Sequence, residues 1–330
     1  MSVTSFNPNP LQADGQQSVE INVQGKPVTV PSITVNSKKV VVTGTWIKMA
    51  VVHDEIWQES ELEDPEFCAE RVKASRSLGF RADILSFAQK LPSTIPKYEY
   101  PRELESIAAV PLTNFQEWWE KLPQESRKNV RRSHKRGVVV RVACLDDTLV
   151  RGLVELNNDS PLRQGRPYSH YGKSFEQVKR DQSDFLDHCD FVGAYLGDEL
   201  VGFLKIVYLG DTASILQLLP KLSHSDKRPA NALLAKAVEL SINKGMSHLI
   251  YGMYNYGTNS DSSLLEFKTR HGFEEMLVPR YYIPLTAWGA FCTRAKLYQP
   301  LATLLPSGLV RMGIALRSKW YSVRNPIKPV

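Results

Sequence analysis

Residues 191–273 constrain the fold more than any other stretch, because strand and helix signals follow one another there in a fixed order. The stretch begins with two apolar runs joined through Gly197-Asp198, a dipeptide typical of the tight turn in a β-hairpin. A third apolar run follows at residues 214–219. This order predicts three consecutive strands, of which the first two form a hairpin.

The second part of the stretch alternates helix and strand. A helix is expected to begin at Pro229, which suits a first helical turn, and to end before Gly245, which suits the position just past a helix. One face of this helix is apolar and comprises Ala230, Leu233, Leu234, Ala237 and Leu240. Residues 248–254 predict a buried strand, and residues 261–270 predict a second helix. The whole order predicts an α/β fold with a mixed sheet and a crossover helix, and a cleft where two strands splay beside the N-terminus of that helix.

Two sequence motifs resemble those of the GNAT acyltransferase fold. The first comprises the loop DKRPANALL, which enters the crossover helix, and the segment LLEFKTRHGFEEM. It is most similar to the Fem-type branch, the aminoacyltransferases that build peptidoglycan bridges, and to uncharacterised GNAT proteins of polysaccharide gene clusters. The second motif, ESRKNVRRSHKRGVVVRVA, resembles the basic helix of that branch, which ends in a glycine and runs into a strand. The resemblance covers about residues 114–285, and it implies two GNAT-like halves in tandem, the first of them degraded.

The chain is expected to have four parts. These are a disordered N-terminus (1–17), a β-rich, degraded GNAT-like half (18–112), a catalytic GNAT- and Fem-like half (113–285) and a basic amphipathic helical tail (286–330). In the first half, residues 18–52 predict three strands, and residues 65–78 predict a helix that ends at Gly79. Two more strands are expected within residues 81–89 and 105–112. The tandem interpretation depends on the resemblance, because the sequence shows no convincing internal repeat.

The composition excludes several classes of protein. No apolar run approaches the roughly 18 residues that a membrane-spanning helix needs, and the N-terminal MSVTSFNPNPLQADGQQ lacks the basic start and apolar core of a secretory signal peptide. The four cysteines are far apart, with neither metal-ligand spacing nor a disulfide framework: Cys68, Cys144, Cys189 and Cys292. The sequence therefore predicts a cytoplasmic protein that holds no metal.

Positive charge is concentrated at the C-terminal end. Residues 276–330 contain eight basic residues and no Asp or Glu, so this segment has a net charge of +8. Because the whole chain has a net charge of +6, residues 1–275 have a net charge of about −2. The body is therefore not basic in the manner of a nucleic-acid-binding protein. The tail predicts two amphipathic helices interrupted at residues 306–308. Two interpretations remain open: the helices pack on the body, or they attach the protein peripherally to the inner face of an anionic membrane.

Two regions carry candidate substrate-binding side chains. The loop at residues 160–175 is expected to bind substrate through Arg163, Arg166, His170 and Tyr171, because a surface loop has little packing reason to hold such residues. The alternative is a loop packed on its own tyrosines. The basic helix carries Arg127, Lys128, Arg131, Arg132, Lys135 and Arg136. These charges suit a polyanion such as a nucleotide, a lipid diphosphate or a tRNA acceptor arm, although a solvated helix face would show the same pattern.

The resemblance places the donor at residues 225–232, just before the crossover helix. GNAT enzymes hold the coenzyme A diphosphate on backbone amides at a helix start, where the helix dipole favours anions. The expected donor-binding groups are Lys227 and Arg228, the amides of Ala230, Asn231 and Ala232, and the strand residues Gln217, Leu218 and Leu219. The loop has no glycine, and Pro229 removes one N–H donor. Acyl-CoA (acetyl-CoA) and aminoacyl-tRNA therefore remain equally open as donors.

The resemblance also implies catalytic roles. A backbone amide within residues 217–219 is expected to stabilise the oxyanion. The acid that protonates the leaving group is expected to be a tyrosine after the next strand, a place occupied by Tyr254 and Tyr256. Lys268 matches a Phe-Lys pair of the Fem-type proteins and is expected to stabilise developing negative charge. No histidine has a partner at recognisable spacing, so the sequence reveals no nucleophile–base pair.

Two classes of function follow. The first is an acyl- or aminoacyltransferase that moves an acyl group to an amino group of a small-molecule or lipid-linked acceptor, such as a sugar or a cell-envelope precursor. The second is a catalytically silent binding module that keeps the fold without the glycine-rich loop. A single cleft that contains Arg163, His170, Tyr171 and Lys268 favours the enzyme, and the same residues scattered apart favour the module.

Overall fold

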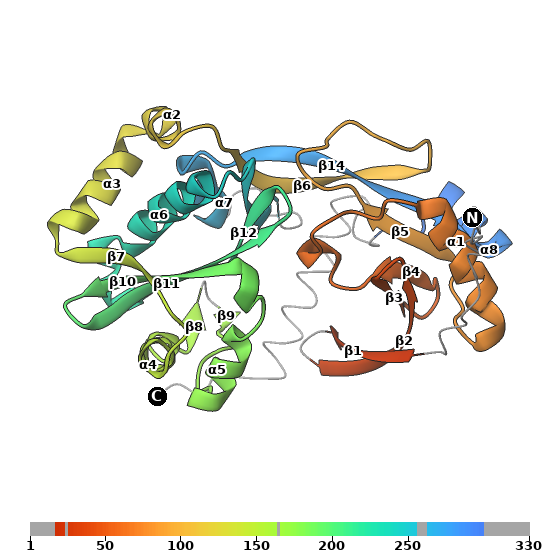
Figure 1. The fold of residues 1–330 in the computed structure, drawn as a ribbon, viewed down its shortest axis with the longest axis horizontal. Coiled ribbons are helices and arrows are strands. Elements are labelled where there is room, and N and C mark those ends of the chain that lie inside the picture. The colour runs from red at the N-terminus through yellow and green to blue at the C-terminus, as the bar shows by residue number, and fades with distance from the viewer. Residues whose placement is uncertain (1–16, 24–25, 164–165, 256–262, 300–330) are drawn as a thin grey trace, which may run out of the picture.

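The structure is a computed structural model of the 330-residue chain, and it describes residues 17–23, 26–163, 166–255 and 263–299 (Figure 1). Within these residues, 12 strands form one mixed sheet in the order β1-β2-β3-β4-β5-β14-β6-β13-β12-β11-β10-β7. A two-stranded sheet, β8-β9, lies apart from it. The predicted α/β fold with a mixed sheet is therefore confirmed.

The first half of the chain forms one end of the sheet. Its elements are β1 (Gln17–Val23), β2 (Lys26–Val35), β3 (Lys38–Thr43), β4 (Met49–Val52), the 3-10 turn η1 (Glu55–Trp57), α1 (Pro65–Ala74), the 3-10 turn η2 (Ser75–Leu78) and β5 (Ile84–Ala88). Four strands precede η1, not the predicted three. Asn36 and Ser37 both adopt left-handed backbone angles, with φ of 47° and 65°, and they form the tight turn that separates β2 from β3. The helix predicted at Pro65 is present, and Asp64 caps it by accepting the backbone N–H of Phe67.

The second half follows the predicted order from β10 to α7. Its elements are β6 (Arg102–Pro111), α2 (Phe115–Lys121), α3 (Gln124–Lys135), β7 (Val138–Ala143), α4 (Asp147–Asn157), β8 (Leu162–Arg163), β9 (Arg166–Pro167), α5 (Phe175–Gln182), the 3-10 turn η3 (Leu186–His188), β10 (Cys189–Leu196), β11 (Glu199–Leu209), β12 (Thr212–Pro220), the 3-10 turn η4 (Leu222–Lys227), α6 (Pro229–Asn243), β13 (His248–Met253), α7 (Ser263–Arg270), β14 (Glu274–Pro284) and α8 (Ala287–Arg294). The predicted hairpin is closed by the pairing of Leu196 with Glu199. Gly197 adopts a φ of 60° in the turn, which is why glycine suits this position.

Alternate side chains of the central strands face two separate cores. On one face, Val192 and Ala194 of β10 pack in a core with Leu233 and Leu234 of α6. On the other face, Phe191 packs in a core with the apolar side of α4. Figure 1 shows the same division, with α2, α3, α6 and α7 on one side of the sheet and α4 and α5 on the other. The sheet is thus covered on both faces in the second half.

The neighbouring strands β12 and β13 are paired only at one end. Residues 212–214 pair in parallel with residues 248–250, after which β13 continues beside β6 and β12 beside β11. In β12 a β-bulge adds an extra residue, Leu216, because Lys205 pairs with Gln217 whereas the next residue of β11 pairs with Ile215. A bulge bends and twists its strand locally. The two strands diverge at this bulge, as the sequence predicted.

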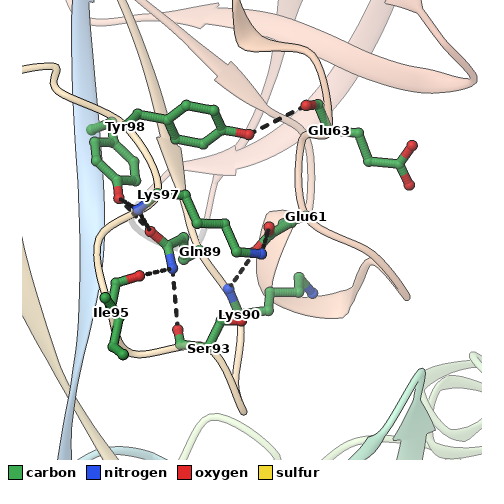
Figure 2. A network of polar contacts seen from close by, with 9 residues as sticks. Glu61, Glu63, Gln89, Lys90, Ser93, Ile95, Lys97 and Tyr98 are labelled. Carbon is green, nitrogen blue, oxygen red and sulfur yellow. Dashed lines mark hydrogen bonds and ion pairs between the residues drawn. The ribbon is translucent and has the colours of Figure 1, made fainter.

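The strands β6 and β14 join the two halves. β14 is antiparallel to β5 and to β6, and β6 also pairs with β13. The long connection from β5 to β6 is held in place by polar contacts (Figure 2). The Gln89 side chain donates to the carbonyl of Ile95 at 3.0 Å and accepts the backbone N–H of Lys97 at 3.0 Å, and the Tyr98 hydroxyl donates to the carbonyl of Glu63 at 3.2 Å. These contacts fix the connection against the acidic segment that precedes α1.

The start of the basic tail packs on the first half of the chain. α8 lies against β14 and β5, with Cys292 fully buried. Gly289 is required in this helix, because a Cβ atom there would lie 1.9 Å from the carbonyl oxygen of Asp83. Beyond the helix, the ring of Tyr298 lies 4.0 Å from that of Tyr282. This part of the tail therefore follows the packing interpretation.

Several predictions concern parts of the chain outside the described residues. These are the disorder of the N-terminus, apart from residue 17, and the tail helix expected beyond residue 308. The first predicted tail helix ends at Arg294, earlier than its apolar pattern suggested. Of the helices that the structure describes, none is long and apolar enough to cross a membrane.

Candidate active site

The diverging strands open a cleft of about 820 Å³. Its walls come from the end of β12, the end of α5 with the turn that follows, the loop between β9 and α5, and η1 with the residue before it. The first half of the chain thus contributes Asp54 and Trp57 to a cleft built mainly by the second half. Tyr251 of β13 also lines it.

A histidine–aspartate pair lies on one wall of the cleft. His170 Nδ1 is 3.6 Å from Asp181 Oδ2, and Lys173 Nζ donates to the same carboxylate oxygen at 2.5 Å. Burial, and after it the charge of Lys173, holds the pKa of His170 below its usual value of 6.5, although Asp181 acts in the opposite direction. The imidazole is therefore neutral near pH 7, the state in which it can accept a proton.

Local capping explains why α5 presents Asp181 to the cleft. Ser174 accepts the backbone N–H of Gln177, and the Gln177 side chain accepts the backbone N–H of Ser174. This reciprocal capping box fixes where the helix begins. Asp181 lies two turns later, beside the loop that carries His170.

Arg163 shapes the opposite wall. Its two terminal nitrogens donate to the carbonyls of Pro220 at 2.9 Å and Leu156 at 3.2 Å, and its guanidinium carbon lies 4.8 Å from the centre of the Tyr168 ring. The Tyr168 hydroxyl donates to Asn157 Oδ1 at 3.0 Å, and burial raises the pKa of this tyrosine. Arg163 therefore fastens the β8-β9 hairpin to the ends of β12 and α4.

A buried lysine supports the turn after α5. Lys205 of β11 is fully buried, and its Nζ donates to the carbonyls of Gln182 at 2.8 Å and Asp184 at 2.6 Å. Its Nζ also lies 4.9 Å from the centre of the Phe191 ring. Burial lowers the pKa of Lys205. Gln182 in turn donates from Nε2 to Gln217 Oε1 at 2.9 Å, which joins α5 to β12.

Lys268 lies behind the cleft, outside its lining. Its side chain is fully buried, its Nζ donates to the carbonyl of Met253 at 2.6 Å, and the same atom lies 4.9 Å from the ring centre of Tyr251, which does line the cleft. Burial lowers the pKa of Lys268 to about 8. One aromatic ring thus separates this ammonium group from the cleft.

The structure brings together part of the predicted set. Arg163, His170, Gln217, Leu218 and Leu219 all line the cleft. Tyr171 is 47% exposed and lies outside the lining. Tyr254 also lies outside it, and its hydroxyl is 3.3 Å from Thr269 Oγ1. The side chain of Arg166 and all of Tyr256 belong to the part of the chain that the structure does not describe.

Other cleft residues were not predicted. Asp54 and Trp57 come from an acidic segment of the first half that carries no binding motif. Asp181 and Gln182 follow the predicted loop, at the end of a short polar helix. No local sequence pattern indicates that these four residues line the cleft, because their positions depend on contacts between segments that are distant in the chain. Among the described residues, no group of histidine, cysteine, aspartate and glutamate side chains is arranged to hold a metal ion.

The predicted donor loop forms the turn that precedes α6. Arg228 adopts a left-handed φ of 57°, and Pro229 begins the helix. Asp226, in the same turn, pairs with Arg136 at 3.1 Å and with Lys227 at 3.5 Å. The basic helix α3 therefore reaches the donor loop through Arg136.

A second pocket, of about 190 Å³, lies beside this turn between α3, α6 and α7. Arg228, Asn231 and His271 line it. His271 Nδ1 lies 2.7 Å from the carbonyl of Phe267, so this nitrogen carries the proton, and Nε2 accepts from Asn231 Nδ2 at 2.8 Å. The Asn231 side chain thus fixes the start of α6 against α7. Ala232 is buried, whereas Ala230 is half-buried.

Comparison with known proteins gives similarity in structure without similarity in sequence. The sequence matches no protein-family model and no curated protein. The structure is similar to FemX, at 12% identity and a TM-score of 0.51, over 80% of this chain and 88% of that chain. It is also similar to a C-terminal domain (DUF2156) assigned to a lysylphosphatidylglycerol synthetase of Agrobacterium fabrum, at 15% identity and a TM-score of 0.52, over 81% and 87% of the two chains.

A third similar structure is a conserved protein of unknown function from Bacteroides thetaiotaomicron, at 8% identity and a TM-score of 0.51, over 78% of this chain and 86% of that chain. At such low identities, these similarities establish a shared fold and not a shared reaction. The chain therefore has a GNAT-like fold that it shares with FemX and with the synthetase domain, in agreement with the fold class that the sequence predicted.

Proposed function

We propose that this chain is an acyl- or aminoacyltransferase that acylates an amino group held in the cleft. The observation that carries the proposal is the position of His170, a neutral imidazole in the wall of a cleft that opens where β12 diverges from β13. The fold supports acyl or aminoacyl transfer in general. The acceptor is a small-molecule or lipid-linked amine.

The reaction forms one C–N bond and breaks the bond between the acyl carbon and the sulfur or oxygen of the donor. As the amine attacks, its proton passes to His170 Nε2, because Nδ1 faces Asp181. Backbone amides within residues 217–219, at the diverging end of β12, stabilise the oxyanion. The departing sulfur or oxygen takes up a proton.

Two further roles are proposed from the Fem-type resemblance. Tyr254 or Tyr256 protonates the leaving group. Lys268 stabilises developing negative charge through its position behind Tyr251.

The donor phosphates are expected to bind at the start of α6. Replacing Lys227 and Arg228 together by alanine should weaken the binding of coenzyme A or of an aminoacyl-tRNA about tenfold, or about 1.4 kcal/mol, because both positive charges flank a helix N-terminus. Calorimetry with each donor measures the change and shows which donor binds.

Lys236→Ala is the matched control, since Lys236 lies in the same helix and pairs with Glu239, away from the turn. Unchanged donor affinity in the double variant would place the donor elsewhere. A chain that binds a donor tightly but never transfers its acyl group would be the catalytically silent binding module instead.

A membrane-facing surface is proposed around α8. Trp46, Trp288 and Phe291 are exposed by 63%, 38% and 55% and form one aromatic patch, with ring centres 5.4 Å apart for the two tryptophans and 5.5 Å apart for Trp288 and Phe291. Aromatic rings beside basic residues are typical of surfaces that lie on an anionic membrane. The sequence of the basic tail continues from this helix. We propose that the patch and the tail together attach the protein to a membrane that holds a lipid-linked acceptor.

Liposome flotation tests this membrane proposal. The full chain should float with anionic vesicles in low salt and not with neutral ones, because each Lys or Arg near an anionic surface contributes about 1 kcal/mol. A chain that ends at Gln299 keeps the packed α8 and should float much less. If this shortened chain floats as well as the full chain, the basic tail does not bind the membrane.

A further inference from the structure

The cleft has an acidic mouth that the proposed chemistry does not explain. Asp54 enters it from the first half, and Asp184 enters it from the turn after α5. Both residues are exposed. Within the described residues, neither carboxylate forms an ion pair with a lysine or an arginine, although Asp184 lies close enough to the buried Lys205 to act on its pKa. The nearest side chain to the Asp54 carboxylate in an ion-pair geometry is His53, whose Nε2 is 3.4 Å from Asp54 Oδ2. The third acid of the lining, Asp181, is neutralised by Lys173.

A buried hydrogen-bond acceptor belongs to a residue in the wall of the same cleft. Gln182 is only 6% exposed and lines the cleft, yet its Oε1 has no hydrogen-bond partner among the described residues. Its Nε2 is already used by Gln217. A buried polar atom without a partner costs about 1–3 kcal/mol, so such an atom in a cleft wall indicates a ligand that donates a hydrogen bond.

Aromatic rings stand beside these acids. The ring of Trp57 lies 5.5 Å from that of Phe185, so the two halves of the chain meet at the mouth through this pair. Aromatic faces attract cations, and most strongly where carboxylates lie nearby. Acids, an unfilled acceptor and aromatic rings are the groups that recognise an ammonium ion.

The backbone at the mouth is held in an uncommon conformation. Asp54 and Phe185 both adopt left-handed backbone angles, with φ of 49° and 62°. For a bulky residue such as phenylalanine this conformation is an outlier, and it persists only where the surroundings hold it. Lys205 supplies that support, through its bonds to the carbonyls of Gln182 and Asp184. Strain of this kind is typical of a ligand-binding position.

We infer that the acceptor carries a second, cationic amine besides the neutral amine that attacks the donor. This second group is held as an ammonium between Asp54 and Asp184 and against Gln182, so the acceptor is not a phosphorylated or carboxylated amine. The name acceptor rests on the proposed function, whereas the binding of a cation does not. The charges of the two sites support the inference. The proposed donor site lies beside the basic helix α3 and contains Lys227 and Arg228, which suits a polyanionic donor. The cleft contains Asp54 and Asp184, which form no ion pair with a lysine or an arginine among the described residues.

Binding of small amines tests the inference without turnover. The probes are 1,4-diaminobutane, a dication, and 4-aminobutanoate, which has the same amine but a carboxylate at the other end. By calorimetry or NMR titration at pH 7, the diamine should bind at least tenfold more tightly than the amino acid, and added salt should weaken it. The double variant Asp54→Asn/Asp184→Asn should lose about tenfold in affinity for the diamine. Asparagine suits the left-handed backbone at residue 54, so this variant keeps the fold.

Asp198→Asn is the control, because Asp198 lies in the hairpin turn between β10 and β11 and outside the cleft lining. It should bind the diamine as the wild type does. Three results would overturn the inference: no diamine binding at millimolar concentration, equal or tighter binding of 4-aminobutanoate, or an equal loss in the Asp198 variant and the double variant.

Transfer assays separate this inference from the proposed function. If the wild-type chain acylates an anionic amine, and the double variant does so at the same rate, the transferase proposal is supported and the cation site is contradicted. If the chain binds the diamine selectively but acylates no amine, the cation site is supported and the transferase proposal is contradicted.

Discussion

Replacement of His170 by glutamine is expected to lower the rate of amine acylation by about 10²-fold or more, with little change in donor binding. Glutamine keeps a polar side chain of similar length but cannot accept the proton of the attacking amine. The loss should appear in kcat, because the proton is transferred in the transition state. Tyr171→Phe is the matched control, since this neighbour is exposed and lies outside the cleft lining.

The pH profile provides a second measurement of the same role. Burial and Lys173 hold the pKa of His170 below 6.5. A base acts in its neutral form, so kcat/KM of the wild type should be constant near pH 7 and fall only as the pH decreases below 6.5. The glutamine variant should lack this decrease. His170→Ala should regain part of its activity when imidazole is added. A glutamine variant with unchanged turnover and an unchanged pH profile would show that another group or the substrate takes the proton.

Replacement of Arg280 by methionine is expected to destabilise the protein by about 3 kcal/mol. Arg280 of β14 donates to Glu55 Oε2 at 2.6 Å, to Ser86 Oγ at 3.2 Å and to Glu105. The side chains of Arg280 and Glu55 are only 18% and 13% exposed, so the variant leaves a nearly buried carboxylate without its counter-charge. The shift of the urea unfolding midpoint, together with the slope of the transition, measures the loss.

A triple variant separates this unpaired charge from lost packing. Arg280→Met/Glu55→Gln/Glu105→Gln removes the acids together with the base, so it should lose less stability than Arg280→Met alone. Equal losses in both variants would mean that the ion pairs contribute nothing and that packing alone explains the effect. The ion pair also holds η1 against β14, so the single variant should weaken diamine binding through the displacement of Asp54 and Trp57.

Much of the fold was predictable from local sequence signals. The turn at Gly197-Asp198 and the limits of α6 at Pro229 and Gly245 depend on the backbone preferences of a few adjacent residues. The three-strand prediction for residues 18–52 missed the turn at Asn36 and Ser37, where two non-glycine residues adopt left-handed backbone angles. The interpretation of residues 18–112 as a degraded copy of the second half stays a prediction.

The site was less predictable, because its residues are distant in the chain. The loop of His170 was recognised from its composition alone, but its partner Asp181 was not, since the pairing depends on how α5 packs beside that loop. Lys205 lies in the middle of an apolar strand, where the sequence gives no sign that it supports the turn after α5. Lys268 was singled out from a motif, yet only the structure shows that it is buried and lies against the ring of Tyr251.

By itself, the sequence determined the order of strands and helices from β10 to α7, with the hairpin and the crossover helix, because these depend on the spacing of apolar residues and on turn residues within a few positions. It also determined the concentration of basic residues in the tail. The tertiary structure decided which strands are neighbours, where β12 separates from β13, and that Asp54 and Trp57 reach a cleft built by the other half. It also decided that Arg280 meets Glu55, 225 positions away. The physical reason is that pairing between distant segments depends on the packing of the whole sheet and its helices, and no local pattern encodes that packing.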